Sequence, residues 1–233
     1  MAKPVCAVTG VGPGNGAAFA RRFAAEGYRV AMLARSEERL RELEGQIAEA
    51  KGFACDVGDR TAVRESFARI RSELGPVDVL VHNAGSGTFG PFLETEPEQL
   101  EEAWRTNTLG LLLCGREVAP DMLKAGRGAI VVIGATASLR GGGAFAAFAS
   151  SKAAQRSLAQ SMARGLGPQG IHVAYVVIDG VIDIPRTRGF FRDRPDDFFL
   201  KPDAIADTVF HLATQDRSAW SFEVDVRPFG EKW

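Results

Sequence analysis

The stretch TGVGPGNG, residues 9–16, lies between the first predicted β-strand and the first predicted helix. Gly10, Gly14 and Gly16 let the chain turn tightly, and together with Asn15 they let backbone N–H groups approach a diphosphate. The positive end of the helix dipole adds favourable charge at the same point. Because this turn opens the first strand–helix unit, it predicts a dinucleotide site. The alternative is a structural turn that binds no ligand.

Short β-branched runs alternate with helical stretches along the rest of the chain. Strands are predicted at 5–9, 29–34, 52–55, 77–82, 129–134, 171–178 and 222–226. Helices are predicted at 15–26, from Ser36 onward, and at 59–74, 95–123, 147–165 and 202–214. Strands this apolar are buried on both faces, which favours parallel pairing with helices above and below. The sequence therefore predicts an α/β fold, a single doubly wound Rossmann-type domain over residues 1–233 with a seven-stranded parallel sheet flanked by helices.

Two local signals refine this outline. Thr95-Glu96-Pro97-Glu98 has the spacing of a capping box, which predicts that the long helix begins there. Residues 183–200 form the one irregular stretch and contain several Arg and Phe residues. Because this stretch follows the sixth strand, we expect it near the carboxyl edge of the sheet, where ligands bind in such folds.

Composition narrows the classes of function. The formal net charge is -1 at pH 7, which predicts no nucleic-acid-binding face and no polybasic membrane anchor. No apolar run approaches the roughly 20 residues of a spanning helix, and the start lacks the pattern of a secretory signal. Cys6, Cys55 and Cys114 are far apart, so we expect buried thiols in a reducing compartment, the cytoplasm, and no metal site.

The turns after several predicted strands resemble those of the short-chain dehydrogenase/reductase family. The family's Thr-Gly-x-x-x-Gly-x-Gly arrangement begins at Thr9, and Asn107 and Lys152 match its helix asparagine and active-site lysine. The resemblance runs from Thr9 to the last predicted strand and implies a nicotinamide dinucleotide cofactor and a small-molecule substrate. The pair that resembles the family's adenine contacts is Asp56 and Val57, and the motif His82-Asn83-Ala84-Gly85 resembles its Asn-Asn-Ala-Gly.

The end of the second strand indicates which dinucleotide is bound. An acidic side chain in that place bonds the ribose 2′-hydroxyl of NAD(H), whereas the sequence here continues Ala34-Arg35-Ser36. The guanidinium of Arg35 suits a 2′-phosphate. We therefore predict NADP(H) in preference to NAD(H). The alternative for Arg35 is a solvated side chain at the start of a helix.

The resemblance fails at the two hydroxyl groups that act on the substrate oxygen in the family. The tyrosine position, four residues before Lys152, holds Phe148, and the serine position holds Ala135. Phe145 occupies the position that some reductases use instead. The remaining tyrosines, Tyr28 and Tyr175, are not expected to reach the nicotinamide. Since a positioned acid is worth about 10² to 10⁴ in rate, ordinary ketone reduction should be severely slowed.

Three interpretations of this loss stay open. The first is a divergent NADP(H)-dependent oxidoreductase that transfers hydride by a non-standard mechanism, with an iminium-like substrate or with a proton from Thr136, Ser138 or water near Asn107. The second is a catalytically silent nucleotide-binding protein that acts as a sensor or assembly partner. The third is that Phe148 and Ala135 are engineered replacements in an ordinary enzyme.

The resemblance also implies roles for other residues. Lys152 is expected to bond the nicotinamide ribose, and Asn107 either supports a water relay or simply bonds backbone. The backbone of Val181 is expected to meet the carboxamide, although Asp179 and Ile184 replace the family's proline and threonine. Residues 183–200 resemble its substrate loop, whose Phe and Arg residues either contact substrate or pack on the core. A homodimer or homotetramer is expected by analogy, with close helix packing at Ala153, Ala154, Ser157 and Ser161.

Overall fold

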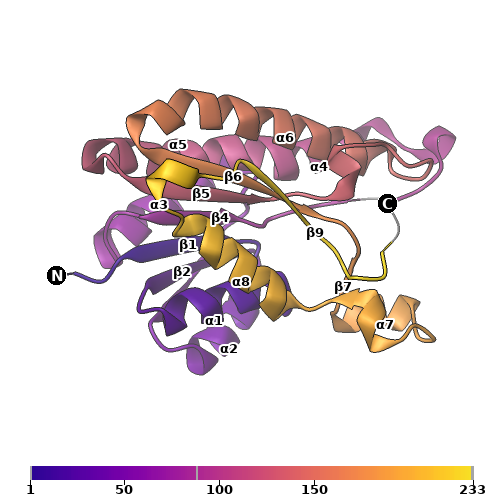
Figure 1. The fold of residues 1–233 in the computed structure, drawn as a ribbon, viewed down its shortest axis with the longest axis horizontal. Coiled ribbons are helices and arrows are strands. Elements are labelled where there is room, and N and C mark those ends of the chain that lie inside the picture. Colours follow the sequence, from indigo (N-terminus) through magenta and orange to yellow (C-terminus); the bar gives the residue numbers. More distant parts are fainter. Residues whose placement is uncertain (1, 88, 232–233) are drawn as a thin grey trace.

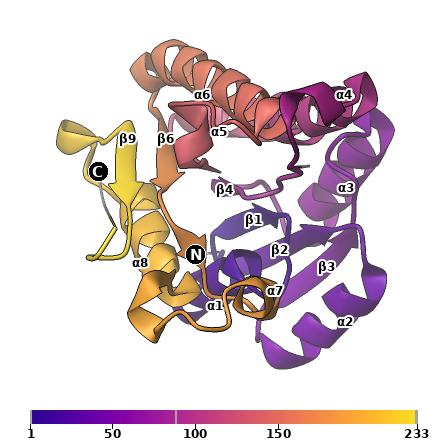
Figure 2. The same ribbon diagram turned by 90° about the vertical axis from the view of Figure 1, so that its right-hand side faces the viewer.

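The main sheet of the protein is parallel and doubly wound. The computed structural model describes residues 2–87 and 89–231. Within them seven strands run in the order β3-β2-β1-β4-β5-β6-β9, every neighbouring pair parallel, as Figure 2 shows from the carboxyl edge. The predicted fold class is therefore confirmed. The strands are β1 Val5–Thr9, β2 Arg29–Ala34, β3 Ala50–Ala54, β4 Val79–His82, β5 Gly128–Ile133, β6 Ile171–Ile178 and β9 Glu223–Val226.

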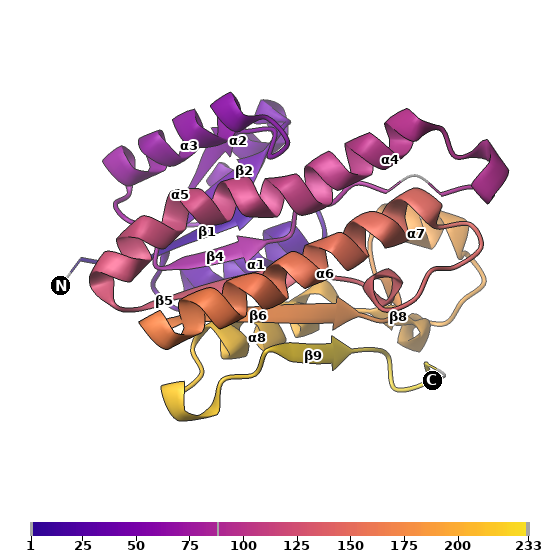
Figure 3. The ribbon, with the colours of Figure 1, turned by 90° about the horizontal axis from the view of Figure 1, so that it is seen from above.

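Helices cover both faces of the sheet (Figures 1 and 3). Phe19 and Phe23 bring α1 onto one face, whereas Phe67 and Met122 bring α3 and α5 onto the other, and all four side chains are buried. None of the described helices is long and apolar enough to cross a membrane. The first face carries α1 Asn15–Ala25, α2 Glu37–Gln46 and α8 Pro202–Ala213, and the second carries α3 Arg60–Glu73, α4 Pro97–Trp104, α5 Gly110–Ala125 and α6 Ala146–Leu166.

The order of the strands creates a crevice at one edge of the sheet. Strand β1 pairs with both β2 and β4, so the chain winds outward through β2 and β3 and then outward the other way from β4. The loops that leave β1 and β4 therefore diverge at the carboxyl edge, which is where open α/β sheets bind ligands. The glycine-rich turn follows β1, and Asn83-Ala84-Gly85 follows β4.

The start of the long helix differs from its prediction. The capping residue is Glu96, not Thr95: the Gln99 side chain accepts a hydrogen bond from Glu96 N at 3.1 Å, while Thr95 Oγ1 donates to the Pro91 carbonyl. The pattern allowed both registers, and Pro97 at the first helical position favours the observed one. The helix is also interrupted at Arg105–Leu109 by a π-helical turn, where Gly110 N donates to the Arg105 carbonyl.

The three cysteines lie in the core without disulfide partners. Cys6, Cys55 and Cys114 are buried and free, as predicted. Burial raises the pKa of the Cys6 and Cys114 thiols well above the ordinary range, so both stay protonated. Among the described residues no cluster of three or more histidine, cysteine or acidic side chains has the geometry to hold a metal ion.

Candidate active site

A cleft of about 650 Å³ opens at the crevice between the loops that follow β1 and β4. Most of the predicted cofactor-binding residues line it, although they come from four separate segments of the chain. Val181 and Lys152 do not: the wall near Val181 is formed by Ile182, and Lys152 is buried. The predicted residues that line the cleft are Gly10, Gly14, Asn15, Gly16, Arg35, Asp56, Val57, Asn83, Ala84 and Gly85.

The glycine-rich turn leaves no room for a side chain at two of its glycines. Gly10 has a φ of 69°, and a Cβ on it would lie 2.5 Å from the Cα of Ala84. Gly16 is equally restricted, because its Cβ would lie 2.6 Å from the Gly10 carbonyl oxygen. Asn15 Oδ1 is buried without a hydrogen-bond partner among the described residues, and it lies at the first residue of α1. The open backbone N–H groups of this helix start fit a diphosphate, whereas the unsatisfied Oδ1 is an acceptor and would need a separate donor.

Basic side chains line the end of the cleft beside β2. Ser36 caps α2, as predicted, by accepting a hydrogen bond from Arg39 N at 3.3 Å. Arg35 and Arg39 are both exposed and line the cleft. Sequence analysis missed Arg39, because it lies in the first turn of α2 whereas Arg35 precedes that helix, so no regular spacing connects the two. Asp56 lies across the cleft and accepts a hydrogen bond from Gly58 N at 2.9 Å.

Polar contacts join the ends of β1 and β4. Thr9 Oγ1 accepts hydrogen bonds from the backbone N–H groups of Asn83 and Ala84, both at 3.2 Å. Asn83 Nδ2 donates to the Gly10 carbonyl at 2.8 Å. His82 is buried beside them with Nδ1 3.2 Å from Thr9 Oγ1, and burial with the nearby charge of Lys152 lowers the pKa of His82 to about 3. The histidine is therefore neutral, and the asparagine motif sets the shape of the glycine turn.

Lys152 reaches the site from α6 with its ammonium group buried. Its Nζ donates to the Ile133 carbonyl at 2.9 Å and to Gln155 Oε1 at 3.0 Å. Desolvation lowers the pKa of Lys152 to about 7. A Cβ on Gly85 would lie 3.8 Å from this Nζ and 3.3 Å from Asn107 Oδ1, which puts both groups next to the cleft wall.

Asn107 occupies the π-helical turn and is fully buried. Its Nδ2 donates to the Ser86 carbonyl at 2.7 Å and to Ser151 Oγ at 2.9 Å, and its Oδ1 accepts from Ser86 N at 3.3 Å. The side chain thus braces the loop after β4 against α6. A π-turn is frequently found at functional sites, because it exposes backbone groups that a regular helix would use.

Phe148, at the tyrosine position, keeps the aromatic ring but lacks the hydroxyl group. Its ring centroid lies 5.4 Å from that of Phe89, which lies 5.2 Å from that of Phe145, both in edge-to-face geometry. We call Phe89, Phe145 and Phe148 the phenylalanine cluster. Phe89 is 55% exposed and Phe145 is 38% exposed, so the cluster presents apolar rings to the outside. A Cβ on Gly87 would lie 2.7 Å from the Phe148 ring, so a larger residue at 87 would displace it.

The other hydroxyl groups near Ala135 are occupied by local partners. Thr136 Oγ1 is 2.5 Å from Asp179 Oδ1 and 3.2 Å from the Ile178 carbonyl. Ser138 Oγ donates to the Ala135 carbonyl at 2.7 Å. The fully buried Tyr175 has its hydroxyl 3.4 Å from the Lys152 carbonyl, and burial raises its pKa to about 12. These hydroxyl groups therefore stabilise backbone in this structure.

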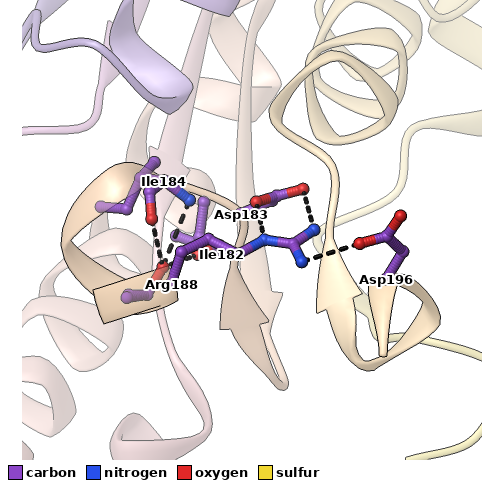
Figure 4. Close-up of polar contacts among 6 residues, drawn as sticks. Ile182, Asp183, Ile184, Arg188 and Asp196 are labelled. Atoms are coloured by element: carbon purple, nitrogen blue, oxygen red, sulfur yellow. Dashed lines mark hydrogen bonds and ion pairs between the residues drawn. The ribbon is translucent and has the colours of Figure 1, made fainter. Parts of the chain in front are cut away.

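The stretch 183–200 is more ordered than predicted. Strand β7 Val181–Ile182 pairs with β8 Phe199–Leu200, and α7 Pro185–Phe190 lies between them. Arg188 donates twice to the Asp183 carboxylate, at 2.7 and 2.8 Å, and once to Asp196 at 2.7 Å (Figure 4). Its guanidinium also stacks 4.0 Å from the Phe199 ring centroid. The expectation of an irregular loop was wrong because these side-chain pairs, separated in sequence, close it.

The segment after β9 packs against the end of β6 at the carboxyl edge of the sheet. Arg227 lies 3.4 Å from Asp179 Oδ2 and 2.6 Å from Asp225 Oδ2. A Cβ on Gly180, whose φ is 147°, would lie 2.8 Å from Pro228, so the segment packs tightly on the end of β6. Asp179 is thus held in an ion pair and does not point alone into the cleft.

Comparisons with known proteins agree with this architecture. The sequence profile of the short chain dehydrogenase family matches residues 4–193. The 3-oxoacyl-[acyl-carrier-protein] reductase of Bos taurus is 32% identical over 185 residues, which cover 79% of this chain and 78% of the bovine chain. The chain spans 55% of the length of one curated relative and 96% of the length of another.

Solved structures resemble the whole chain. A short-chain dehydrogenase from Rhodopseudomonas palustris has a TM-score of 0.83 and 36% identity, covering 97% of this chain and 99% of that chain. A metagenomic short-chain oxidoreductase in complex with NADP has a TM-score of 0.85 and 33% identity, covering 99% of both chains. The profile match, these identities and the shared fold lead to one conclusion. The chain belongs to the short-chain dehydrogenase/reductase family, a family of NAD(P)-dependent oxidoreductases.

Proposed function

We propose that this protein is an NADP(H)-dependent oxidoreductase that transfers hydride to or from a small organic substrate without a tyrosine proton donor. The observation that carries the proposal is the cleft itself, which the glycine-rich turn, three arginines and the asparagine motif line together. Gly10, Gly14 and Gly16 with Asn15 would hold the diphosphate, and Asp56 and Val57 the adenine. Asn83, Ala84, Gly85 and Val181 would bound the nicotinamide half.

The preference for the phosphorylated cofactor rests on charge. After Ala34, the residues from the end of β2 and the start of α2 that line the adenosine end of the cleft are Arg35, Ser36 and Arg39. A 2′-phosphate placed there would meet two guanidinium groups and a helix start. The similar metagenomic oxidoreductase is in complex with NADP, which supports the same cofactor in this chain. NAD(H) binds the same cleft more weakly on this proposal.

The chemistry follows from what surrounds the reacting carbon. A bound nicotinamide would supply or accept the hydride, and Lys152 would hold the adjoining ribose with the N–H group that its bonds to Ile133 and Gln155 leave over. Phe148 and the other rings of the phenylalanine cluster would offer the substrate an apolar surface. A substrate that is already cationic at the hydride acceptor, such as an iminium, needs no strong acid and is attracted by aromatic faces. Positioning alone then lowers the barrier.

A second function is favoured by the occupied hydroxyl groups. Thr136, Ser138 and Tyr175 all engage local partners, so no side-chain hydroxyl described around Ala135 is left to protonate a carbonyl oxygen. A protein that binds NADP(H) without turnover, as a sensor or assembly partner, fits this arrangement. The two functions share the cofactor site and differ only in chemistry.

Cofactor consumption across substrate classes separates the two functions. NADPH oxidation is measured with ketones, enones and cyclic imines, with Lys152→Ala as the control variant. We expect cyclic imines to turn over above the control and ketones to react at least about 10²-fold more slowly, because the positioned acid is absent. Tight NADPH binding by calorimetry, with turnover of every class equal to the control, would instead establish the silent binder.

Assembly and location complete the proposal. The faces of α6 at Ala153, Ser157 and Ser161 are exposed and small, which suits close helix packing in a homodimer or homotetramer. Buried, reduced thiols suit the cytoplasm. Light scattering tests the assembly.

A further inference from the structure

Gln155 is a buried polar residue that the proposed function does not use. It lies one turn beyond Lys152 on α6 and is 0% exposed. Its Oε1 accepts a hydrogen bond from Lys152 Nζ at 3.0 Å, and its Nε2 donates to the Asn107 carbonyl at 2.8 Å. One carboxamide therefore connects the lysine of α6 with the π-helical turn.

The position of Gln155 would ordinarily be apolar. It lies on the buried face of α6 together with Ser151 and Ala159, four residues to either side. Burying a carboxamide costs free energy unless both its oxygen and its nitrogen are hydrogen-bonded. Both are bonded here, and the acceptor for Nε2 is a carbonyl within the π-turn. The residue is thus matched to two groups of the candidate site and to no others.

No charged partner stabilises the ammonium group of Lys152. No ion pair joins it to a carboxylate in the described part of the chain. From β4 it faces His82, which is neutral because burial lowers its pKa to about 3. From β6 the Tyr175 hydroxyl contacts the backbone carbonyl of Lys152, and this hydroxyl is neutral because burial raises its pKa to about 12. Ile133 O and Gln155 Oε1 are the acceptors that remain.

We propose that Gln155 is a positioning residue that fixes the Lys152 ammonium group against the Asn107 carbonyl and keeps it charged for the cofactor ribose. A carboxamide accepts at oxygen and donates at nitrogen, so this bridge holds the lysine without carrying a proton between the two ends. Lys152 then acts as a stationary hydrogen-bond donor. The role in cofactor binding rests on the proposed function, whereas the bridge itself does not.

The bridge predicts the direction in which each Gln155 variant shifts the pKa of Lys152. Gln155→Leu removes one of two acceptors from a buried ammonium group, so the pKa of Lys152 should fall further below about 7. Gln155→Glu places a carboxylate at hydrogen-bond distance, so the pKa should rise by about one to three units. A purely structural glutamine would change stability in both variants without moving this pKa in opposite directions.

Two readouts measure the pKa of Lys152. The titration of the Lys152 side chain, followed by NMR of ¹³C-labelled lysine across about pH 5 to 10, needs neither a cofactor nor access of a reagent to the buried amine. The pH dependence of NADP⁺ affinity by calorimetry gives the same inflection if the ammonium group binds the ribose. The matched control is Gln160→Leu, the same change farther along α6 at a half-buried position.

We expect the inflection to move up in Gln155→Glu, down in Gln155→Leu and not at all in Gln160→Leu. Circular dichroism verifies that each variant is folded, and if Gln155→Leu unfolds, the glutamate variant alone decides. An unchanged titration of Lys152 in folded Gln155→Glu would overturn the proposal. Failure of the proposed function would look different, because absent turnover leaves the titration of Lys152 and its response to Gln155 intact.

Discussion

Arg35 and Arg39 place two guanidinium groups at one end of the cleft, and neither forms an ion pair with a carboxylate in the described residues. Uncompensated arginines beside a helix start repel one another unless an anion lies between them. At the scale of single residues, this arrangement gives the most direct test of cofactor choice.

Replacing either arginine should weaken the phosphorylated cofactor selectively. Arg35→Ala and Arg39→Ala should each raise the dissociation constant of NADPH about 10- to 100-fold, because a hydrogen bond to a charged group contributes about 1.5–3 kcal/mol. The affinity for NADH should change little. Calorimetry with both cofactors measures the ratio, and Arg41→Ala, an exposed arginine on α2 paired with Glu37, is the control. Equal loss of both cofactors would contradict a phosphate contact.

Residues whose role follows from a local turn could be predicted from the sequence. Gly10, Asn83 and Arg35 each follow a strand directly, and parallel strands bring their carboxyl ends to one edge. Gln155 and Arg39 could not be assigned in this way, because their partners come from other turns of a helix or from distant segments. Nothing local in the sequence distinguishes Gln155 from Gln160, and only the position of the π-turn gives it a partner.

The same division holds for whole elements. Strands β1, β2 and β6 have the predicted bounds because each is a continuous apolar run between turn residues. The stretch 183–200 was predicted to be irregular because its order depends on Arg188, whose partners Asp183 and Asp196 lie five residues before and eight residues after it. Asp183 holds the pKa of Arg188 above its usual range, and Arg188 in turn lowers the pKa of the Asp183 carboxyl.

Removing this arginine should loosen the loop while leaving the sheet intact. In Arg188→Ala the two aspartates lose their shared cation, so the backbone amides of 181–200 should exchange with solvent faster. Hydrogen exchange followed by mass spectrometry measures this, with β1 and β6 as internal references. The matched variant is Arg192→Ala, whose exposed side chain donates only to the Gly189 carbonyl. If both variants exchange like the parent, the ion pairs do not order the loop.

At the scale of the whole molecule, burial of His82 links stability to pH. Its pKa falls to about 3 in the fold, against an ordinary value of 6.5, so between these values the unfolded chain binds more protons. The free energy of unfolding should therefore fall as pH decreases from about 6.5, by up to about 1.4 kcal/mol per pH unit from this group. Stability from this source is fully present above the unfolded pKa.

Urea unfolding from about pH 7 to about pH 4 tests the linkage. The variant His82→Asn removes the titrating group and should flatten the decline of the free energy of unfolding with acid. His211→Asn changes an exposed histidine on α8 and should leave the slope as it is. A parent-like slope in His82→Asn would show that acid sensitivity arises elsewhere.

The ion pair between Arg227 and Asp179 has a practical consequence for handling the protein. Because Arg227 and Pro228 lie against the end of β6, any domain fused behind β9 would start at the carboxyl edge of the sheet, the edge at which the cleft opens. Residues before β1 lie at the opposite ends of the strands, about 25 Å away along the eight residues of β6 (Figure 1). An affinity tag or fluorescent reporter placed ahead of Val5 should therefore leave ligand access undisturbed.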